Sequence, residues 1–274
     1  EAVFKRALSV GPPYFNLTFT PLMALVLLAL PIAPYLAWKR GDLMAVLQRL
    51  WVAAALTALA ITLSWAFMGG KALAAIGIGL GTWLVCGAIS EVLDRVRFGK
   101  LPAPQVWARV KGLQRAAWGM TIAHLGMGVF VLGAVSETAF RVEHTASLGL
   151  GESTSFAGRT VTLKAVTAEE GPNYYADRAQ LIVTDGKREL TLAPERRFYP
   201  AARMPTTEVA LRSSLAGDVY AALGDPAEIN GRMAWTVRMY WNPLVLAIFG
   251  GAFLMALGGA VSLTDRRLRI GAPQ

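Results

Sequence analysis

PLVLAIFGGAFLMALGGAVSL, residues 243–263, is an uncharged apolar run long enough to cross a lipid bilayer. At about 1.5 Å per residue it can span roughly 30 Å of hydrocarbon. Four further apolar stretches lie upstream, at about residues 21–38, 51–68, 73–90 and 116–135. The composition agrees, because 54% of the residues are apolar, 16% are charged and the mean hydropathy is +0.44. We therefore predict a polytopic α-helical membrane protein with about five transmembrane helices.

A large soluble protein with five buried core helices would show similar runs. The remaining sequence contains too little amphipathic helix to cover five apolar rods, so this alternative is disfavoured. Residues 1–20 lack the short apolar core and cleavage site of a secretory signal peptide. The chain starts at Glu1 rather than Met, which indicates processing or a piece of something longer. Cys86, the single cysteine, lies within the third stretch and excludes an internal disulfide.

Basic residues predict the orientation in the membrane. They gather in the connections after the first, third and fifth stretches, so these segments are expected to be cytoplasmic by the positive-inside rule. The N-terminus, despite Lys5 and Arg6, and residues 136–242 then lie on the opposite side. The twelve basic residues of the three segments are Lys39, Arg40, Arg49, Arg95, Arg97, Lys100, Arg109, Lys111, Arg115, Arg266, Arg267 and Arg269.

Charge also separates the predicted domains, which are residues 1–135 with four helices, 136–242, and 243–274 with the last helix and a cytoplasmic tail. Residues 136–242 contain 12 Lys and Arg against 13 Asp and Glu, so this domain is close to neutral. The net charge of +9 therefore belongs to the membrane-flanking loops, where it suits anionic lipid headgroups. Nucleic-acid binding, which needs a clustered basic face, is unsupported.

The 136–242 segment reads as a small, mostly-β extracytoplasmic domain inserted before the last helix. Residues 156–166, 180–184 and 234–240 alternate apolar and polar side chains, as strands do. Asp185-Gly186 predicts a hairpin turn that leads to a returning strand at 189–192. Residues 210–223 fit either a strand at 218–222 or a short helix. A domain of this length can form one sandwich or barrel core.

This domain carries no hydrolytic motif. His144 is its only histidine and no cysteine accompanies it, so a surface histidine is favoured over a zinc site. Ser153 and Ser155 lack the strand-turn-helix context of a nucleophile and are assigned to a turn. GPNY at 171–174 and RRFYP at 196–200 mix aromatic, charged and turn-forming residues, which suits a binding surface and ordinary loop packing equally.

His124 is the sharpest chemical signal, because it lies near the middle of the fourth stretch, in WGMTIAHLGMG at 118–128. An ionisable side chain at that depth indicates function by default. Imidazole is a strong ligand for haem iron, and Gly119, Gly126 and Gly128 are positioned to clear space for a macrocycle. The alternative is a histidine hydrogen-bonded to a neighbouring helix, with the glycines serving helix packing. The two readings carry equal weight, since no second intramembrane histidine occurs in the chain.

A series of motifs along the whole chain resembles, in the same order, the C-terminal part of the CcmF family of cytochrome c-type biogenesis proteins. The motifs are SVGPPYFN at 9–16, WGM to HLG at 118–126, GES at 151–153, EGPNY at 170–174, ERRFYP at 195–200, TE at 207–208, DVYAALG at 218–224 and MALGG at 255–259.

The resemblance implies a role in attaching haem covalently to apocytochrome c on the outer, periplasmic face of the bacterial cytoplasmic membrane. In this family a periplasmic haem chaperone delivers haem to a tryptophan-rich segment, which is absent here. The family also holds a haem b between two intramembrane histidines, and the position matching the second ligand is His124. Its partner would come from an N-terminal portion of the same protein or from a split subunit.

The resemblance thus implies part of a haem lyase, or holocytochrome c synthase, that is not expected to be active alone. Expected partners are that N-terminal portion, the haem chaperone, apocytochrome c, other maturation subunits and membrane lipid. The competing hypothesis is a non-enzymatic membrane assembly or transport subunit with a periplasmic binding domain. Transporter halves commonly show broken helices or paired midplane polar residues, whereas here Pro21, Pro31 and Pro34 crowd only the first stretch.

Overall fold

The computed structural model describes residues 11–36, 42–67, 69–186, 188–229 and 231–265. The basic residues Lys5, Arg6, Lys39, Arg40, Arg266, Arg267 and Arg269, and the first two residues of the SVGPPYFN motif, lie outside these ranges. The chain divides into a helical unit, Glu1–Val135 with Ala247–Gln274, and a β unit, Ser136–Leu246. We describe each unit by itself.

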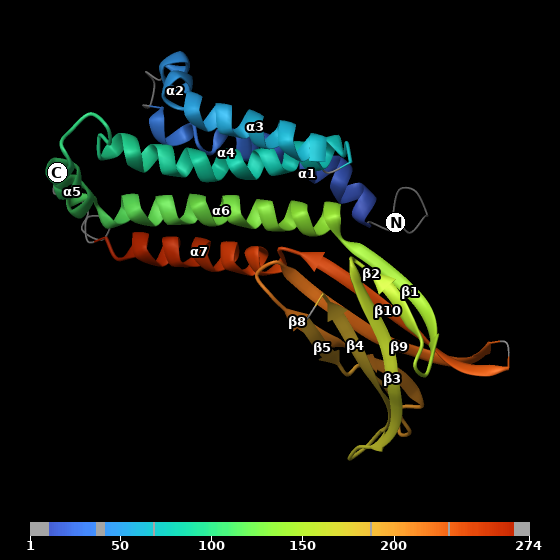
Figure 1. Ribbon diagram of the computed structural model, residues 1–274. Coiled ribbons are helices and arrows are strands. Elements are labelled where there is room, and N and C mark those ends of the chain that lie inside the picture. The colour runs from blue at the N-terminus through green and yellow to red at the C-terminus, as the bar shows by residue number, and fades with distance from the viewer. Residues whose placement is uncertain (1–10, 37–41, 68, 187, 230, 266–274) are drawn as a thin grey trace, which may run out of the picture. The chain divides into compact units, whose positions relative to one another are not determined.

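The described helices follow one another in chain order, and all but the last precede the strands (Figure 1). They are α1 Pro12–Ala29, the 3-10 turn η1 Ala33–Tyr35, α2 Leu43–Arg49, α3 Trp51–Phe67, α4 Ala72–Arg95, α5 Ala103–Gly112, α6 Arg115–Phe140 and α7 Val245–Leu263.

Four of the described segments are long and apolar enough to cross a membrane alone: Tyr14–Tyr35, Ala72–Arg95, Arg115–Phe140 and Val245–Leu263. A fifth span results if α2 and α3, which are bent by 65° at their junction, count as one. The 17 residues of α3 rise only about 25 Å, which is short of a hydrocarbon core of ~30 Å. The predicted fold class, about five membrane helices with a mostly-β domain before the last, is confirmed.

The first helix begins earlier than its expected start at residue 21. Pro12 and Pro13 occupy its first two positions, where a missing N–H costs nothing and a fixed φ favours the helix. Pro21 therefore lies inside α1 rather than at its start. The apolar run extends as far as η1, and residues 37 and 38 of the expected span lie outside the described residues.

The third span also continues further than expected, because α4 ends at Arg95 instead of residue 90. Its last turn includes Glu91, which the sequence assigned to the following connection. Within that connection the chain forms α5, an amphipathic helix that carries Arg109 and Lys111 in its last turn. Arg109 and Lys111 thus lie on a helix, while Arg97 and Lys100 lie in the turn that follows α4.

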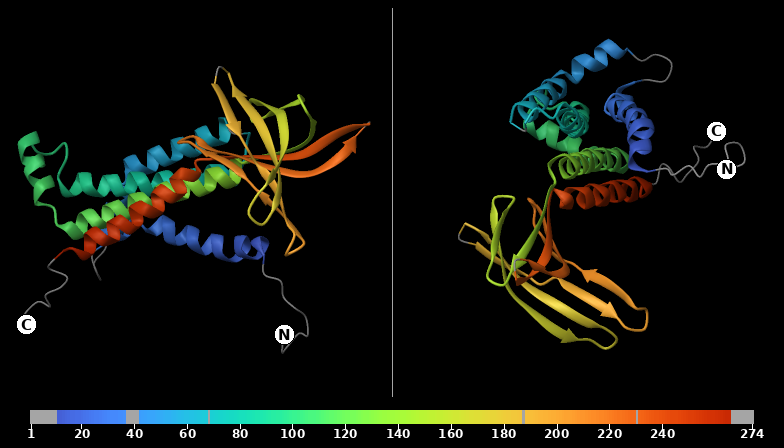
Figure 2. Two further views of the ribbon diagram at one scale, coloured as in Figure 1. Left: turned by 90° about the horizontal axis from the view of Figure 1, so that it is seen from below. Right: turned by 90° about the vertical axis from the view of Figure 1, so that its right-hand side faces the viewer.

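Glycines bring α6 and α7 into direct backbone contact. A Cβ added at Gly119 would lie 2.5 Å from the Gly258 carbonyl oxygen, and one at Gly126 would lie 2.7 Å from that of Gly251. The spacing of seven residues on both helices keeps these glycines on one face. An end view shows α6 lying between α4 and α7 (Figure 2). Absent side chains, rather than apolar bulk, therefore set this helix-helix distance.

The β unit contains ten described strands in two antiparallel sheets. One sheet has the order β1-β10-β9-β8, and the other has the order β2-β3-β4-β6-β7, with β5 also paired to β4. The strands are β1 Val142–Gly149, β2 Ser153–Phe156, β3 Arg159–Glu170, β4 Tyr175–Asp185, β5 Arg188–Leu192, β6 Glu195–Tyr199, β7 Met204–Glu208, β8 Ala210–Ser213, β9 Gly217–Ile229 and β10 Arg232–Pro243.

Alternate residues of both sheets form one apolar core. Leu163, Leu181 and Leu223 are fully buried, as are Val237 and Met239 on β10. Because side chains alternate across a strand, burying every second residue commits one face of each sheet to this core. The unit is therefore two sheets packed face to face.

Three sequence interpretations of this unit need correction or completion. Residues 156–166 do not form one strand, because Ala157 and Gly158, with φ of 48° and 75°, make a tight turn between β2 and β3. Ser153 and Ser155 lie in β2 rather than in a turn. Residues 210–223 contain strand β8 and much of β9, with no helix. The Asp185-Gly186 turn is found, with Gly186 at φ 59°.

Replacing Gly258 with alanine should destabilise the helical unit. The new Cβ would lie 2.5 Å from the Ala123 nitrogen and the Gly119 carbonyl oxygen, so α7 must move away from α6. We expect a loss of about 1–3 kcal/mol, typical of overpacking, measured by thermal unfolding in detergent. Gly259→Ala is the matched control, because its Cβ would meet nothing within 4 Å. Equal effects of the two variants would contradict the glycine contact.

Candidate functional site

His124 lies on the face of α6 that contacts α4. On the same face, Gly128 approaches the Gly81 carbonyl oxygen of α4, and Leu132 packs against Gly81 itself. Gly119 and Gly126 instead face α7. All three glycines flanking His124 therefore pack against neighbouring helices, as the helix-packing alternative expected, and none leaves an open clearing among the described residues.

A narrow pocket adjoins His124, formed by α4, α6 and the break between α1 and η1. Its other lining residues are Leu30, Pro31, Pro34, Leu84, Gly87, Ala88 and Glu91. Pro31 packs directly against α4 at Gly87, because Gly87 has no side chain. A Cβ at Gly87 would lie 2.4 Å from Pro31 Cβ. Trp83 Nε1 donates a hydrogen bond of 3.0 Å to the Leu28 carbonyl oxygen and ties α1 to α4. Two of the three prolines of the first span, Pro31 and Pro34, therefore line this pocket, while Pro21 lies within α1.

Glu91 is a buried carboxylate in the same pocket, with only 4% of its surface exposed. It forms an ion pair with Arg95 one turn along α4. It also accepts a hydrogen bond of 3.1 Å from Thr121 Oγ1, three residues before His124 on α6. This interaction joins α4 to α6 beside the imidazole. The sequence interpretation missed Glu91 as a site residue, although an acidic residue at the end of an apolar stretch was a signal for it.

His124 would supply one ligand to a haem iron, but its surroundings do not enclose a macrocycle. The half-buried imidazole supplies the required nitrogen donor. The pocket has no room for a water-sized sphere, whereas pockets that enclose ligands typically measure ~300–1,000 Å³. The described part of the chain thus offers a ligand without enclosing a macrocycle. The other wall of such a site, and a second imidazole, would have to come from further protein.

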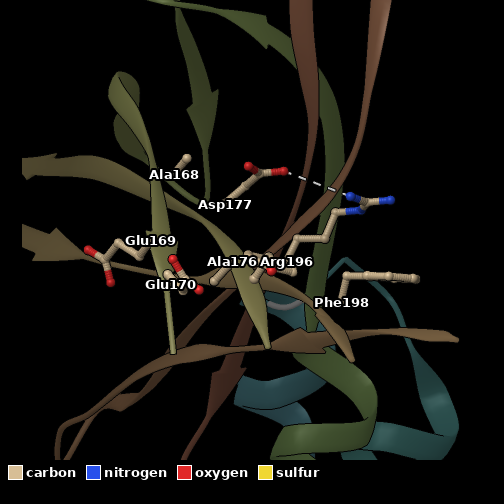
Figure 3. A pocket seen from close by; sticks show the side chains of 8 residues that line it. Ala168, Glu169, Glu170, Ala176, Asp177, Arg196 and Phe198 are labelled. Atoms are coloured by element: carbon tan, nitrogen blue, oxygen red, sulfur yellow. Dashed lines mark ion pairs between the residues drawn. The ribbon is translucent and has the colours of Figure 1, made fainter. Parts of the chain in front are cut away.

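The β unit has an open pocket of about 460 Å³ at one end of its larger sheet, lined by residues of β3, β4 and β6 (Figure 3). Tyr175 of β4 lies opposite Phe198 of β6, and Asp177 lies opposite Arg196. The Asp177 carboxylate points toward the Arg196 guanidinium, 3.8 Å away, which also pairs with Asp225 at 2.7 Å. Aromatic residues are enriched at protein-binding surfaces, and polar side chains form the rim of such surfaces.

Charged side chains stiffen the same end of the sheet. Arg178 lies 2.6 Å from Glu195 and 3.2 Å from Glu169, and Glu195 also pairs with Arg197 at 2.8 Å. The attraction of Glu195 is the main cause of the raised pKa of Arg178. Arg197 stacks over the Tyr174 ring at 4.3 Å. The GPNY and RRFYP motifs, left open between binding and loop packing, therefore meet in space.

The remaining candidate residues have structural partners. His144 Nε2 lies 3.1 Å from Thr154 Oγ1, and Ser153 Oγ lies 2.8 Å from Thr162 Oγ1. Neither contact assembles a nucleophile with a base. Among the described residues, no group of three His, Cys, Asp or Glu side chains is arranged to hold a metal ion.

Comparison with known proteins links these features to one family. Residues 139–243 match the family described as the CcmF C-terminal beta-sandwich. The cytochrome c-type biogenesis protein CycK of Bradyrhizobium diazoefficiens is 42% identical over 97% of this chain and 40% of its own length. The cytochrome c-type biogenesis protein CcmF of Escherichia coli K12 is 34% identical over 96% of this chain and 39% of its own length.

A solved structure has the same fold. The cytochrome c heme lyase CcmF superposes with a TM-score of 0.71 at 22% identity, over 93% of this chain and 41% of that one. The chain thus spans about 40% of the length of the relatives it matches. At this identity the structural likeness establishes the fold, while the sequence relatives establish the kinship.

Removing the Glu91 carboxylate should loosen α4 from α6. Glu91→Ala deletes the acceptor for Thr121 Oγ1 and the partner of Arg95, and we expect a loss of roughly 1–3 kcal/mol. Asp94→Ala is the control, because its pairs with Arg49 and Lys100 lie at the surface and are worth under about 1 kcal/mol. Thermal unfolding in detergent measures both, and equal small losses would contradict a supporting role for Glu91.

Proposed function

The chain belongs to the CcmF family of cytochrome c-type biogenesis proteins, and we propose that it is part of a membrane complex that attaches haem covalently to apocytochrome c. The names of its relatives, cytochrome c-type biogenesis protein and cytochrome c heme lyase, support this activity. Because the chain spans about 40% of their length, we expect no catalysis from it alone. The N-terminal portion of the same protein, or a split subunit, would complete the lyase.

The observation that carries the proposal is the position of His124 in the membrane-spanning helix α6, beside a narrow pocket. We propose that its imidazole is one axial ligand of a haem b whose second ligand lies outside this chain. When bound, the haem supplies one-electron redox chemistry. The role of the protein is to present the imidazole rigidly, and the Thr121 to Glu91 hydrogen bond fixes α6 against α4 at that level.

The membrane orientation follows from the flanking charges. Arg95 ends α4, and Arg97 and Lys100 follow it. Arg109 and Lys111 lie on α5, and Arg115 begins α6. This cluster favours the cytoplasmic side for that connection. Since α6 then crosses the bilayer, the β unit that follows it is proposed to lie in the periplasm of a bacterial inner membrane. Apocytochrome c and a haem chaperone would meet the complex on that side.

We further propose that the surface around Tyr175 and Phe198 docks the haem chaperone, apocytochrome c or another maturation subunit. Both rings are exposed, at 56% and 41%, although aromatic residues are costly to leave in water. The ion pairs of Arg178 and Arg197 hold their strands in a fixed geometry. A rigid surface with exposed aromatic rings loses little entropy on binding.

His124→Ala should abolish the b-type haem of the complex. With the N-terminal portion supplied, the wild-type complex is expected to purify with a reducible b-type absorbance spectrum and bound iron. His144→Ala is the matched control, because that ring contacts Thr154 in the β unit. Visible spectra and iron content report the outcome without any assay of activity. A spectrum that survives His124→Ala unchanged would show that the ligand assignment is wrong.

Photo-crosslinking tests the docking surface. A photoreactive phenylalanine analogue at Phe198 should capture the chaperone, apocytochrome c or a partner subunit in cells that contain the complete maturation system. The same analogue at Met233, which is more exposed than Phe198 and lies on the β9–β10 hairpin, should capture far less. Mass spectrometry identifies the products. Recovery of none of these three partners from Phe198 would refute docking at this surface.

A further inference from the structure

A second large pocket of the β unit lies between β5 and the β8–β9 turn, with a volume of about 580 Å³. Three arginines from three different strands line it: Arg159 of β3, Arg188 of β5 and Arg212 of β8. Trp241 and Leu215 also line the pocket and supply apolar surface. None of these residues belongs to the docking surface or to the pocket beside His124.

The charge of this pocket is unbalanced. Its two carboxylates are Asp185 and Glu189, and Asp185 is already paired with Arg159 at 3.0 Å. Arg188 and Arg212 form no ion pair with any carboxylate in the described part of the chain. Two unpaired guanidinium groups against one carboxylate leave a net positive site. Guanidinium groups bind phosphate oxygens through paired N–H donors.

The turn that closes the pocket is fixed next to a membrane span. The Leu244 amide donates a hydrogen bond of 3.1 Å to the Ala216 carbonyl oxygen, and α7 begins at the next residue. Gly217, at φ 150°, allows the start of β9 to approach the end of β10, because a Cβ there would lie 2.5 Å from the Asn242 carbonyl oxygen. The β8–β9 turn is therefore hydrogen-bonded to the residue that directly precedes the apolar helix α7.

The apolar residues of the pocket suit a boundary between lipid and water. Leu215 at the tip of the turn is 84% exposed, which is unfavourable in water and favourable against lipid. Trp241 lies four residues before α7, and Arg159 stacks over its ring at 4.3 Å. Tryptophan is enriched at the boundary between lipid and water because its ring is apolar and its N–H is polar. A soluble anion would make no use of Leu215.

We propose that this pocket binds the phosphate of an anionic phospholipid headgroup at the membrane surface. Arg188 and Arg212 contact the phosphate, Trp241 lies at the glycerol level, and Leu215 inserts among the acyl chains. The bound lipid would hold the β8–β9 turn against the bilayer. This site is independent of the haem ligand and of the docking surface.

Native mass spectrometry of the complete complex tests the site. The complex is purified in neutral detergent and incubated with phosphatidylglycerol or phosphatidylcholine at equal concentration. We expect preferential retention of phosphatidylglycerol, reduced about 10–30-fold in the Arg188→Gln/Arg212→Gln variant, since each basic residue near an anionic lipid surface contributes a several-fold factor. Leu215→Gln should weaken retention as well, because the apolar contact is lost.

Lys164→Gln/Arg203→Gln is the matched control, since it removes the same charge from exposed positions outside the pocket. Thermal unfolding without lipid verifies that each variant is folded, and Leu215→Gln keeps the test decisive if the double variant is not. Equal retention of the two lipids, or equal loss in the pocket and control variants, would overturn the proposal. Displacement of the lipid by equimolar inorganic phosphate would likewise assign the site to a free anion.

Discussion

Direct backbone contact between α6 and α7 is the constraint on which the rest of the structure depends. Lipid tails are as apolar as leucine side chains, so the hydrophobic effect does not drive helices together inside the bilayer. Close packing must supply the attraction between α6 and α7. Glycines at 119 and 126 on α6 meet glycines at 258 and 251 on α7. A chain that leaves the membrane at the end of one helix must therefore return beside it. The inserted β unit meets this demand, because its first and last strands pair from Val142 opposite Trp241 onward.

The same packing leaves one face of α6 for chemistry. With glycines committed to α7, the residues Thr121, His124 and Gly128 face α4 and the break after α1. Burying Glu91 here would be expensive in isolation, but Arg95 and Thr121 supply a charge partner and a hydrogen bond. The imidazole thus lies on a helix held from two sides, and this rigidity suits the proposed role as a ligand.

Sequence alone predicted what depends on composition and local turn chemistry. The apolar runs predicted the spans, and Asp185-Gly186 predicted a hairpin that the structure contains. The assignment of His124 as a ligand stays a prediction. The misses depend on tertiary partners. Glu91 reads as a loop residue until Thr121 is brought beside it from a separate helix. The Ala157-Gly158 turn was hidden because alternation continues through it, and only the pairing of β2 with β3 separates the strands.

The net charge of the β unit does not show how its charges are distributed. The unit is close to neutral overall, but positive and negative side chains gather at opposite ends of β3. Arg159 begins β3 in the arginine pocket, and Glu169 and Glu170 end the same strand at the docking surface. Ten residues of strand place these ends about 33 Å apart at ~3.3 Å per residue, which is several Debye lengths at physiological salt. The two ends therefore act as independent surfaces. The arginine pocket lies at the start of β3, and the carboxylates and aromatic rings lie at the far end of the same strand. Each surface can therefore bind a partner of different chemistry without competing with the other.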